Sequence, residues 1–559
     1  MIENPILPGF HPDPSIVRDG DDYWIATSTF EWLPGIRLHH SRDLVHWRPA
    51  GHALTRPSQI DLQGVAPSKG VWAPALSVDH GLWHLCYSLV RNITDNYFDV
   101  DNFLITAQVA TGPWSDPVYL NSSGFDPSLY HGEDGRKWLV NLEWDFRPGH
   151  EHPGAIVIQE FSPGEGRLIG EPRPLYRGGS DLGCLEGPHL FRRRGFFYLM
   201  AAEGGTGYGH GVTLARSENL FGPWTPDPTN PILTSASHRF QARGNPEYLK
   251  SEKFNPDSIL QKSGHGSLVE TPAGETYLVH LCARPALPQL RCVLGRETAI
   301  QKMEWTADGW LRLAGGGNLA RASVTEPELS PVPWPSDPIR DDFEAPSLSP
   351  HWASPRCLAD ESWASLRRPG WLGLRGRESL FSPFTPSVVA RRIQHLDFTA
   401  QTRLVFDPRS FQEMAGLVCL YDTMNFVYLR LGWDQGTRVL DLMRADNGRR
   451  EEFPGHRVLL PPPPPEGEPP PVRLRVEARG LGLRFSWALD EGDWSSIGPV
   501  FDETKLSDEY CKTGEFTGAF VGLTAQDLSR RQAWAWFDWF DYSGNPAANQ
   551  AAAEDTTEA

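Results

Sequence analysis

The sequence predicts an all-β protein in which a five-bladed β-propeller is followed by a β-sandwich. Three observations carry this prediction. A short proline-flanked motif recurs through residues 1–322, segments of alternating apolar and polar residues fill residues 341–545, and no long amphipathic helical pattern occurs. A chain of 559 residues is also too long for one hydrophobic core and suits two domains.

The first copy of the motif is Leu7–Val17, in which Asp13 stands between Pro12 and Pro14, just ahead of a short apolar run. Each proline fixes its own φ and favours an extended conformation in the residue before it. Asp13 is therefore held at the mouth of a predicted strand. A lone Asp-Pro pair is more simply explained by an N-terminal turn, so the recurrence of the motif is what points to a site.

The motif returns at four further places, and each copy is followed by a turn and a second run rich in aromatic and β-branched residues, as strands are. The four copies are Trp72–Leu76, Phe125–Tyr130, Leu185–Phe191 and Gly264–Val269. The second runs of the five units are Tyr23–Thr27, Leu82–Tyr87, Lys137–Val140, Phe196–Met200 and Thr276–His280. Self-similar units of several strands at this spacing are typical of propeller blades.

The first residues of the innermost strands of a propeller sit together at one mouth of its channel. The five positions expected there are Asp13, Ala73, Asp126, Glu186 and His265. Three of them are carboxylates and none is Lys or Arg, which turn formation alone explains poorly. Neighbouring carboxylates push their pKa values apart and so separate an acid from a base, as glycoside hydrolysis requires.

The second half of the chain begins after a proline-rich, stiff linker at residues 323–340. Alternating segments such as Phe398–Leu404, Phe426–Leu431 and Val472–Val476 predict antiparallel strands of a sandwich over residues 341–545. The prolines at 461–465 and 469–471 cannot join a central sheet and predict a surface loop. Residues 546–559 are expected to be a flexible tail.

Composition narrows the class of protein. A net charge of −18 argues against nucleic acid or an anionic membrane surface as a partner, whereas a neutral sugar is unaffected by it. The first residues carry no basic and apolar leader pattern, and no apolar run reaches the length of a membrane span, so we expect a cytoplasmic protein. Seven cysteines without metal-type spacing fit reduced structural thiols.

Four stretches together resemble one family: Asn4–Ser15, Ala26–Trp32, Leu294–Gln301 and Phe516–Gly522. The chain resembles the glycoside hydrolase family 43 β-xylosidases that join a five-bladed propeller to a C-terminal sandwich of the concanavalin-like jelly-roll type. The resemblance implies that Asp13 is the general base, Glu186 the general acid, and Asp126 the carboxylate that orients the acid and modulates its pKa. It implies no cofactor for the chemistry and a homo-oligomer, either a dimer or a tetramer.

The same resemblance places further residues. It implies that Arg296 lies beside the acids in the subsite of the non-reducing xylose, although from the residues alone an ion pair on a strand is the simpler reading. His265 would face the central cavity, where members of the family can hold a calcium or other ion or water; a satisfied core histidine is the alternative. Phe516 would close the funnel as part of a loop of the sandwich, or else plug the sandwich core.

Phe30, Trp72 and Trp144 lie close to the predicted mouth in sequence. Sugars stack on aromatic rings, so these three are candidate substrate-binding residues, while packing between blades is the competing explanation.

The predicted function is an inverting exo-β-1,4-xylosidase that releases xylose from the non-reducing end of short xylo-oligosaccharides. An α-L-arabinofuranosidase on the same scaffold is the first alternative, because the two pentoses have similar shapes. A retaining fructan or sucrose hydrolase ranks lower, since its nucleophile stands in an Asn-Asp-Pro-Asn setting and Asp13 does not. A non-catalytic sugar-binding propeller predicts the loss of a carboxylate, and all three carboxylates are present.

Overall fold

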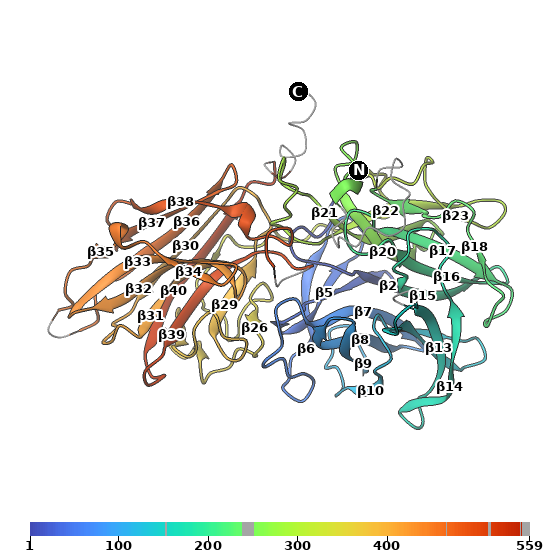
Figure 1. Cartoon of the computed structure of the whole chain (residues 1–559), viewed down its shortest axis with the longest axis horizontal. Coiled ribbons are helices and arrows are strands. Elements are labelled where there is room, and N and C mark those ends of the chain that lie inside the picture. Colours follow the sequence, from blue (N-terminus) through green and yellow to red (C-terminus); the bar gives the residue numbers. More distant parts are fainter. Residues whose placement is uncertain (151–153, 237–250, 465–466, 513–515, 548, 550–559) are drawn as a thin grey trace.

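The computed structural model describes the chain except residues 151–153, 237–250, 465–466, 513–515, 548 and 550–559. It confirms the predicted fold class, an all-β chain with a five-bladed propeller and a sandwich that lie side by side (Figure 1). The described residues also include three short 3-10 turns, η1 (Ser251–Lys253), η2 (Pro454–His456) and η3 (Glu503–Lys505). No helix among the described residues has the length and apolar character needed to span a membrane.

Each blade is an antiparallel sheet whose first strand lies innermost, and consecutive strands pair in chain order. Blades one and two contain β2 (Ser15–Asp19), β3 (Asp22–Thr27), β5 (Gly35–Ser41), β6 (Arg48–Leu54), β7 (Gly70–Asp79), β8 (Leu82–Thr94), β9 (Tyr97–Ala107) and β10 (Val118–Asn121). Blades three to five contain β11 (Ser128–His131), β12 (Lys137–Trp144), β13 (Gly154–Ser162), β14 (Arg167–Tyr176), β15 (Glu186–Arg193), β16 (Phe196–Glu203), β17 (Gly211–Ser217), β18 (Thr225–Pro226), β19 (Leu233–Thr234), β20 (Gln261–Glu270), β21 (Thr276–Ala283), β22 (Glu297–Trp305) and β23 (Leu311–Leu313).

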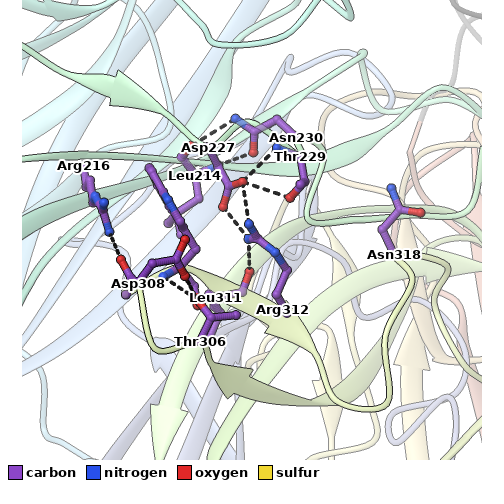
Figure 2. Close-up of polar contacts among 12 residues, drawn as sticks. Leu214, Arg216, Asp227, Thr229, Asn230, Thr306, Asp308, Leu311, Arg312 and Asn318 are labelled. Atoms are coloured by element: carbon purple, nitrogen blue, oxygen red, sulfur yellow. Dashed lines mark hydrogen bonds and ion pairs between the residues drawn. The ribbon is translucent and has the colours of Figure 1, made fainter.

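Polar contacts join the outer parts of neighbouring blades. Figure 2 shows the seam between blades four and five, where Arg312 of β23 reaches both carboxylate oxygens of Asp227, at 2.5 and 3.0 Å. Thr229 donates to the same carboxylate, and Asn230 exchanges hydrogen bonds with the backbone of Leu214. At the ends of the propeller, β1 (Ile2–Glu3) pairs with β24 (Ser323–Val324), so the first strand of the chain is tied to the last of this domain.

The sandwich consists of two antiparallel sheets packed over the largest apolar cluster of the described chain. One sheet contains β25 (Arg340–Asp341), β27 (Ala364–Ser365), β28 (Leu372–Arg375), β30 (Phe398–Val405), β36 (Val472–Arg479), β37 (Gly482–Leu489), β38 (Ser495–Asp502) and β40 (Trp534–Gly544). The other contains β29 (Ser387–Arg392), β31 (Glu413–Asp422), β32 (Asn425–Asp434), β33 (Thr437–Asp446), β34 (Arg449–Glu452), β35 (Val458–Leu459) and β39 (Phe520–Asp527).

The two domains share an apolar core as well as polar contacts. Trp32 of the propeller stacks on Phe520 of the sandwich with ring centroids 3.7 Å apart, and β4 (Trp32–Leu33) pairs with β26 (Ser354–Pro355). The linker lies on blade one, where Trp334 donates to the carbonyl of His46 over 3.2 Å. Burial of large aromatic surfaces on both sides fixes the sandwich against the propeller mouth.

Candidate active site

The inner strands of the propeller begin with a backbone of unusual conformation. Asp13, Ala73, Asp126 and His265 all have positive φ, between 43° and 57°. Non-glycine residues seldom adopt this region, and they cluster at functional sites because surrounding structure must enforce it. The repeated motif therefore marks a repeated backbone turn that aims one side chain per blade toward the same mouth.

The fourth blade differs from the expectation by one residue. There the left-handed residue is Gly187, with φ 58°, and it precedes Pro188 as Asp13 precedes Pro14. Glu186 thus occupies the position of Trp72 and Phe125, one step earlier, and the prediction that it takes the same place as Asp13 is wrong. Successive side chains of an extended strand point to opposite faces, so Glu186 points differently from the other carboxylates.

Gly187 connects two of the other positions. Its N–H donates to Oδ2 of Asp126 over 2.8 Å. Gly187 also packs closely against the ring of His265. A Cβ atom added at position 187 would lie 3.3 Å from Cε1 and Nε2 of that ring. A side chain at position 187 would push the histidine away, so glycine is required here for close approach as well as for its φ.

Asp13 is half-buried and fixed by a serine of the next strand. The Ser28 hydroxyl donates to Oδ2 of Asp13 over 2.6 Å and accepts the N–H of Ala73 over 2.8 Å. Oδ1 of Asp13 lies 3.7 Å from Nδ1 of His265. One oxygen of the carboxylate is thus anchored, and the other faces the centre of the channel mouth.

Asp126 is buried, and burial raises its pKa to about 6. His265 opposes that rise, the charge of Asp13 adds to it, and the hydrogen bond from Gly187 opposes it. Its own N–H is held by the Ser88 hydroxyl at 3.1 Å. A carboxyl with this pKa carries a negative charge above about pH 6, and that charge makes ionisation of a neighbouring acid harder.

His210, which sequence reasoning missed, lies against Glu186. Its Nε2 is 4.0 Å from Oε1 of Glu186. Its Nδ1 is 3.2 Å from the carbonyl of Lys262, which can only accept, so Nδ1 carries the proton. Burial, followed by the charge of His265, lowers the pKa of His210 to about 3, so the ring is neutral and Nε2 presents a lone pair to Glu186.

Arg296 is completely buried and reaches across the domain interface. It donates to Asp508 of the sandwich and, over 3.0 Å, to the carbonyl of Thr206. Its guanidinium also lies 5.5 Å from the centre of the Phe516 ring. The ion pair that the residues alone suggested is present, but its partner comes from the other domain, and sequence spacing gave no sign of Asp508.

The structure places the aromatic candidates along one series of rings. Trp72 and Phe125 are 5.9 Å apart, and Phe125 and Trp144 are 6.0 Å apart. Phe516 of the sandwich meets Trp72 edge-on at 6.3 Å. Phe30 is buried among Phe10 and Trp72, at 5.5 and 5.8 Å, which gives it a packing contact on both sides. Residues 513–515 of the loop before Phe516 lie outside the described residues.

A cavity of about 530 Å³ lies away from these residues, farther along the inner strands at the other end of the channel. Paired charges line it, Arg192 with Glu133 and Arg193 with Glu270, together with His131. The candidate chemistry belongs to the opposite end, where the carboxylates of Asp13 and Glu186 face His265 and His210 and Asp126 accepts the N–H of Gly187.

Comparison with known proteins identifies the class. Residues 2–311 match the family model for glycosyl hydrolases family 43, and residues 340–543 match the model of the β-xylosidase C-terminal concanavalin A-like domain. The chain belongs to glycosyl hydrolase family 43 and is a glycoside hydrolase. Enzymes of this family need no cofactor for catalysis.

Several similar proteins span the whole chain. It is 43% identical to a xylosidase/arabinosidase of Humicola insolens, with 97% of each chain covered. It is 42% identical to a xylan 1,3-β-xylosidase of a Vibrio species, with 97% of this chain and 99% of that one covered. Its fold matches the crystal structure of a xylan β-1,4-xylosidase from Bacillus halodurans at a TM-score of 0.90 and 48% identity, over 97% of this chain and all of that one.

Proposed function

We propose that this chain is an inverting exo-β-1,4-xylosidase that releases xylose from the non-reducing end of short xylo-oligosaccharides. In this proposal Asp13 is the general base that activates a water, and Glu186 is the general acid that protonates the leaving oxygen. Asp126 orients the site through Gly187 and keeps Glu186 protonated by its charge.

The observation that carries the proposal is the different environment of the two carboxylates. Asp13 accepts a hydrogen bond from Ser28 and faces His265, whereas Glu186 faces the lone pair of a neutral His210. An enzyme that uses two carboxyls as base and acid needs this division. A sugar-binding module without catalysis would have no use for it.

The substrate class is supported by the relatives and by the sandwich. The similar proteins described above act on xylosides or arabinosides by name, and one of them is a β-1,4-xylosidase. Phe516 and Asp508 bring the sandwich to the propeller mouth, where they limit its depth and favour short chains. Arg296, Trp72 and Trp144 are proposed to contact the sugars, and Phe30 to support them.

An α-L-arabinofuranosidase, as main or side activity, is the second candidate, favoured by the dual name of the Humicola insolens relative. A panel of nitrophenyl β-xyloside, nitrophenyl α-arabinofuranoside, and β-1,4- and β-1,3-linked xylobiose separates the choices. We expect the highest kcat/KM on the β-xyloside and preference for β-1,4-xylobiose. A higher kcat/KM on the arabinofuranoside would overturn the assignment, and preference for the β-1,3-linked disaccharide would overturn the linkage.

Three further features stay proposals. A calcium or other ion at His265 would have few protein ligands, since no group of three or more His, Cys, Asp or Glu side chains that could hold a metal occurs among the described residues. Calcium prefers six to eight oxygens, so a single imidazole fits it poorly.

A homo-oligomer, either a dimer or a tetramer, is testable by light scattering. A cytoplasmic location is testable by fractionation of the source cells.

A further inference from the structure

Two consecutive acidic residues of the sandwich reach the mouth of the propeller. Asp508 and Glu509 follow η3 and are buried, with side chains 0% and 10% exposed. Asp508 accepts from Arg296 on one oxygen and from the Tyr421 hydroxyl on the other. Glu509 accepts from Nζ of Lys262 and, over 2.7 Å, from the N–H of Cys292.

The four charged groups form a neutral set that neither domain completes alone. The propeller supplies two cations, Arg296 and Lys262, both with fully buried side chains, and the sandwich supplies two anions. A buried charge is tolerated only when a partner and hydrogen bonds replace its lost hydration. Without the sandwich carboxylates, each cation would lose the carboxylate that it contacts.

Both cations are linked to the environment of Glu186. The carbonyl of Lys262 holds Nδ1 of His210, which sets the tautomer that faces Glu186. The charge of Arg296 also acts on His210, where it adds to burial and His265 in lowering the pKa. Two short paths therefore run from the sandwich to the acid, Asp508–Arg296–His210 and Glu509–Lys262–His210.

We propose that Asp508 and Glu509 are positioning residues of the active site, which hold Arg296 and Lys262 in place and cancel their charge beside His210 and Glu186. This inference rests on the proposed role of Glu186 as general acid. In this proposal the sandwich affects the reaction through the charges of Asp508 and Glu509, in addition to limiting the depth of the propeller mouth.

The charged and titratable groups around Glu186 set the direction of the expected effect. Among the described residues, His210 before β17 lies against Glu186, and Asp126 before β11 contacts the next residue, Gly187. His265 in β20 and Arg296 before β22 act on His210, and Asp13 before β2 faces His265. Removing the charge of Asp508 takes away the carboxylate that contacts Arg296, so more of the positive charge of Arg296 acts on its surroundings. A nearby cation favours the ionised carboxylate, so the acid would lose its proton at lower pH.

The test is Asp508→Asn, which keeps an oxygen for Tyr421 and removes the negative charge. On whichever aryl glycoside the wild-type protein cleaves best, we expect kcat/KM to fall about tenfold or more, and the alkaline limb of its pH profile to move to lower pH. A folded Asp508→Asn protein with kcat/KM within about twofold of wild type and an unmoved limb would overturn the proposal.

Two further variants separate positioning from stability. Arg356→Met removes another buried sandwich cation that touches the propeller, where its Nε donates to the carbonyl of Val65 over 2.6 Å. It should lower Tm and leave the alkaline limb in place, and an equal shift of the limb would refute the proposal. If Asp508→Asn does not fold, Tyr421→Phe removes the hydroxyl that donates to Asp508 and should move the limb the same way by less. An unmoved limb there would also refute the proposal.

These outcomes do not depend on the identity of the sugar. If the wild-type protein fails to release xylose from xylobiose but cleaves another glycoside, the substrate assignment falls and the test of Asp508 still stands. If Glu186→Gln leaves the alkaline limb unchanged while Asp508→Asn moves it, the acid assignment falls instead.

Discussion

The two ends of the propeller channel are formed by the same five inner strands, yet their charged groups are arranged differently. At the end where the strands begin, Asp13 lies 3.7 Å from Nδ1 of His265, Asp126 accepts the N–H of Gly187, and Glu186 lies 4.0 Å from Nε2 of His210. At the other end, Arg192 and Arg193 neutralise Glu133 and Glu270 beside an open cavity. Imidazoles and a backbone N–H face the carboxylates at the first end, whereas guanidinium groups pair with them at the other end.

The difference has a backbone cause. At the first end each inner strand has a left-handed residue at its start or within its first residues, which interrupts the regular pairing there. Past this point the strands have regular pairing, such as Ser128 with Val140 and Leu190 with Leu199, and charged side chains meet across neighbouring blades. Regular strands favour paired charges, and strained turns allow like charges to converge.

The largest expected effect comes from the base and the acid. Asp13→Asn should lower kcat by about 10²–10⁴-fold on both xylobiose and an activated aryl xyloside, because both need the activated water. Glu186→Gln should lower kcat on xylobiose by a similar factor and on the aryl xyloside far less, because a good leaving group needs no proton. Steady-state kinetics on the two substrates measure the contrast. Equal losses for both substrates in Glu186→Gln would contradict its role.

A smaller effect is expected from Asp126. With its pKa raised to about 6, this carboxylate is ionised above that pH, and its charge raises the pKa of a neighbouring acid. Asp126→Asn removes the charge, so the alkaline limb of kcat/KM against pH should move to lower pH. Glu133→Gln at the far end is the control and should leave the limb unchanged. A limb that stays in place in both variants would refute the coupling.

A third prediction concerns Phe516, the sandwich residue that is proposed to limit the depth of the propeller mouth. Phe516→Ala should raise KM for xylobiose severalfold with a small change in Tm, because the ring contacts Trp72 and Arg296 and is half-buried. Phe411, which is 72% exposed on the sandwich, provides the matched control for a surface phenylalanine. If Phe516→Ala instead lowers Tm by several degrees with KM unchanged, Phe516 is core packing.

The smallest effect is expected at the far end. Glu270→Gln breaks the ion pair with Arg193, which is partly exposed, and such pairs contribute about 0–1 kcal/mol to stability. We expect kcat/KM within about twofold of wild type and a slight fall in Tm. A tenfold loss of kcat/KM would show that the far end takes part in the reaction and would remove the contrast between the two ends.

Much of this architecture is predictable from the sequence because it repeats. The recurring Asp-Pro and Ala-Pro pairs mark Asp13, Ala73 and Asp126, which share a left-handed backbone conformation, and period-two segments located strands such as β30 and β36. In the fourth blade the predicted alignment of the repeats is shifted by one residue, because it matches Glu186 to Asp13. The structural equivalent of Asp13-Pro14 is Gly187-Pro188. Aligning the repeats by their prolines instead of their acidic residues would have matched Gly187 to Asp13.

The remaining contacts at the site carry no local signal. Arg296 and Asp508 are 212 residues apart and lie in different domains, and Lys262 and Glu509 are 247 residues apart. His210 has no motif, and its role depends on a backbone carbonyl 52 residues away. Such partners are fixed by packing of the two domains, which one sequence does not encode in any spacing.

The measurement that tests the central claim most directly is the anomeric form of the first sugar released. An NMR time course of β-xyloside hydrolysis distinguishes direct attack by an activated water from a covalent enzyme intermediate. If Asp13 activates water and Glu186 protonates the leaving oxygen, α-xylose should appear first and convert slowly to the equilibrium mixture. Initial release of β-xylose would contradict the account, because it would require a carboxylate to act as nucleophile.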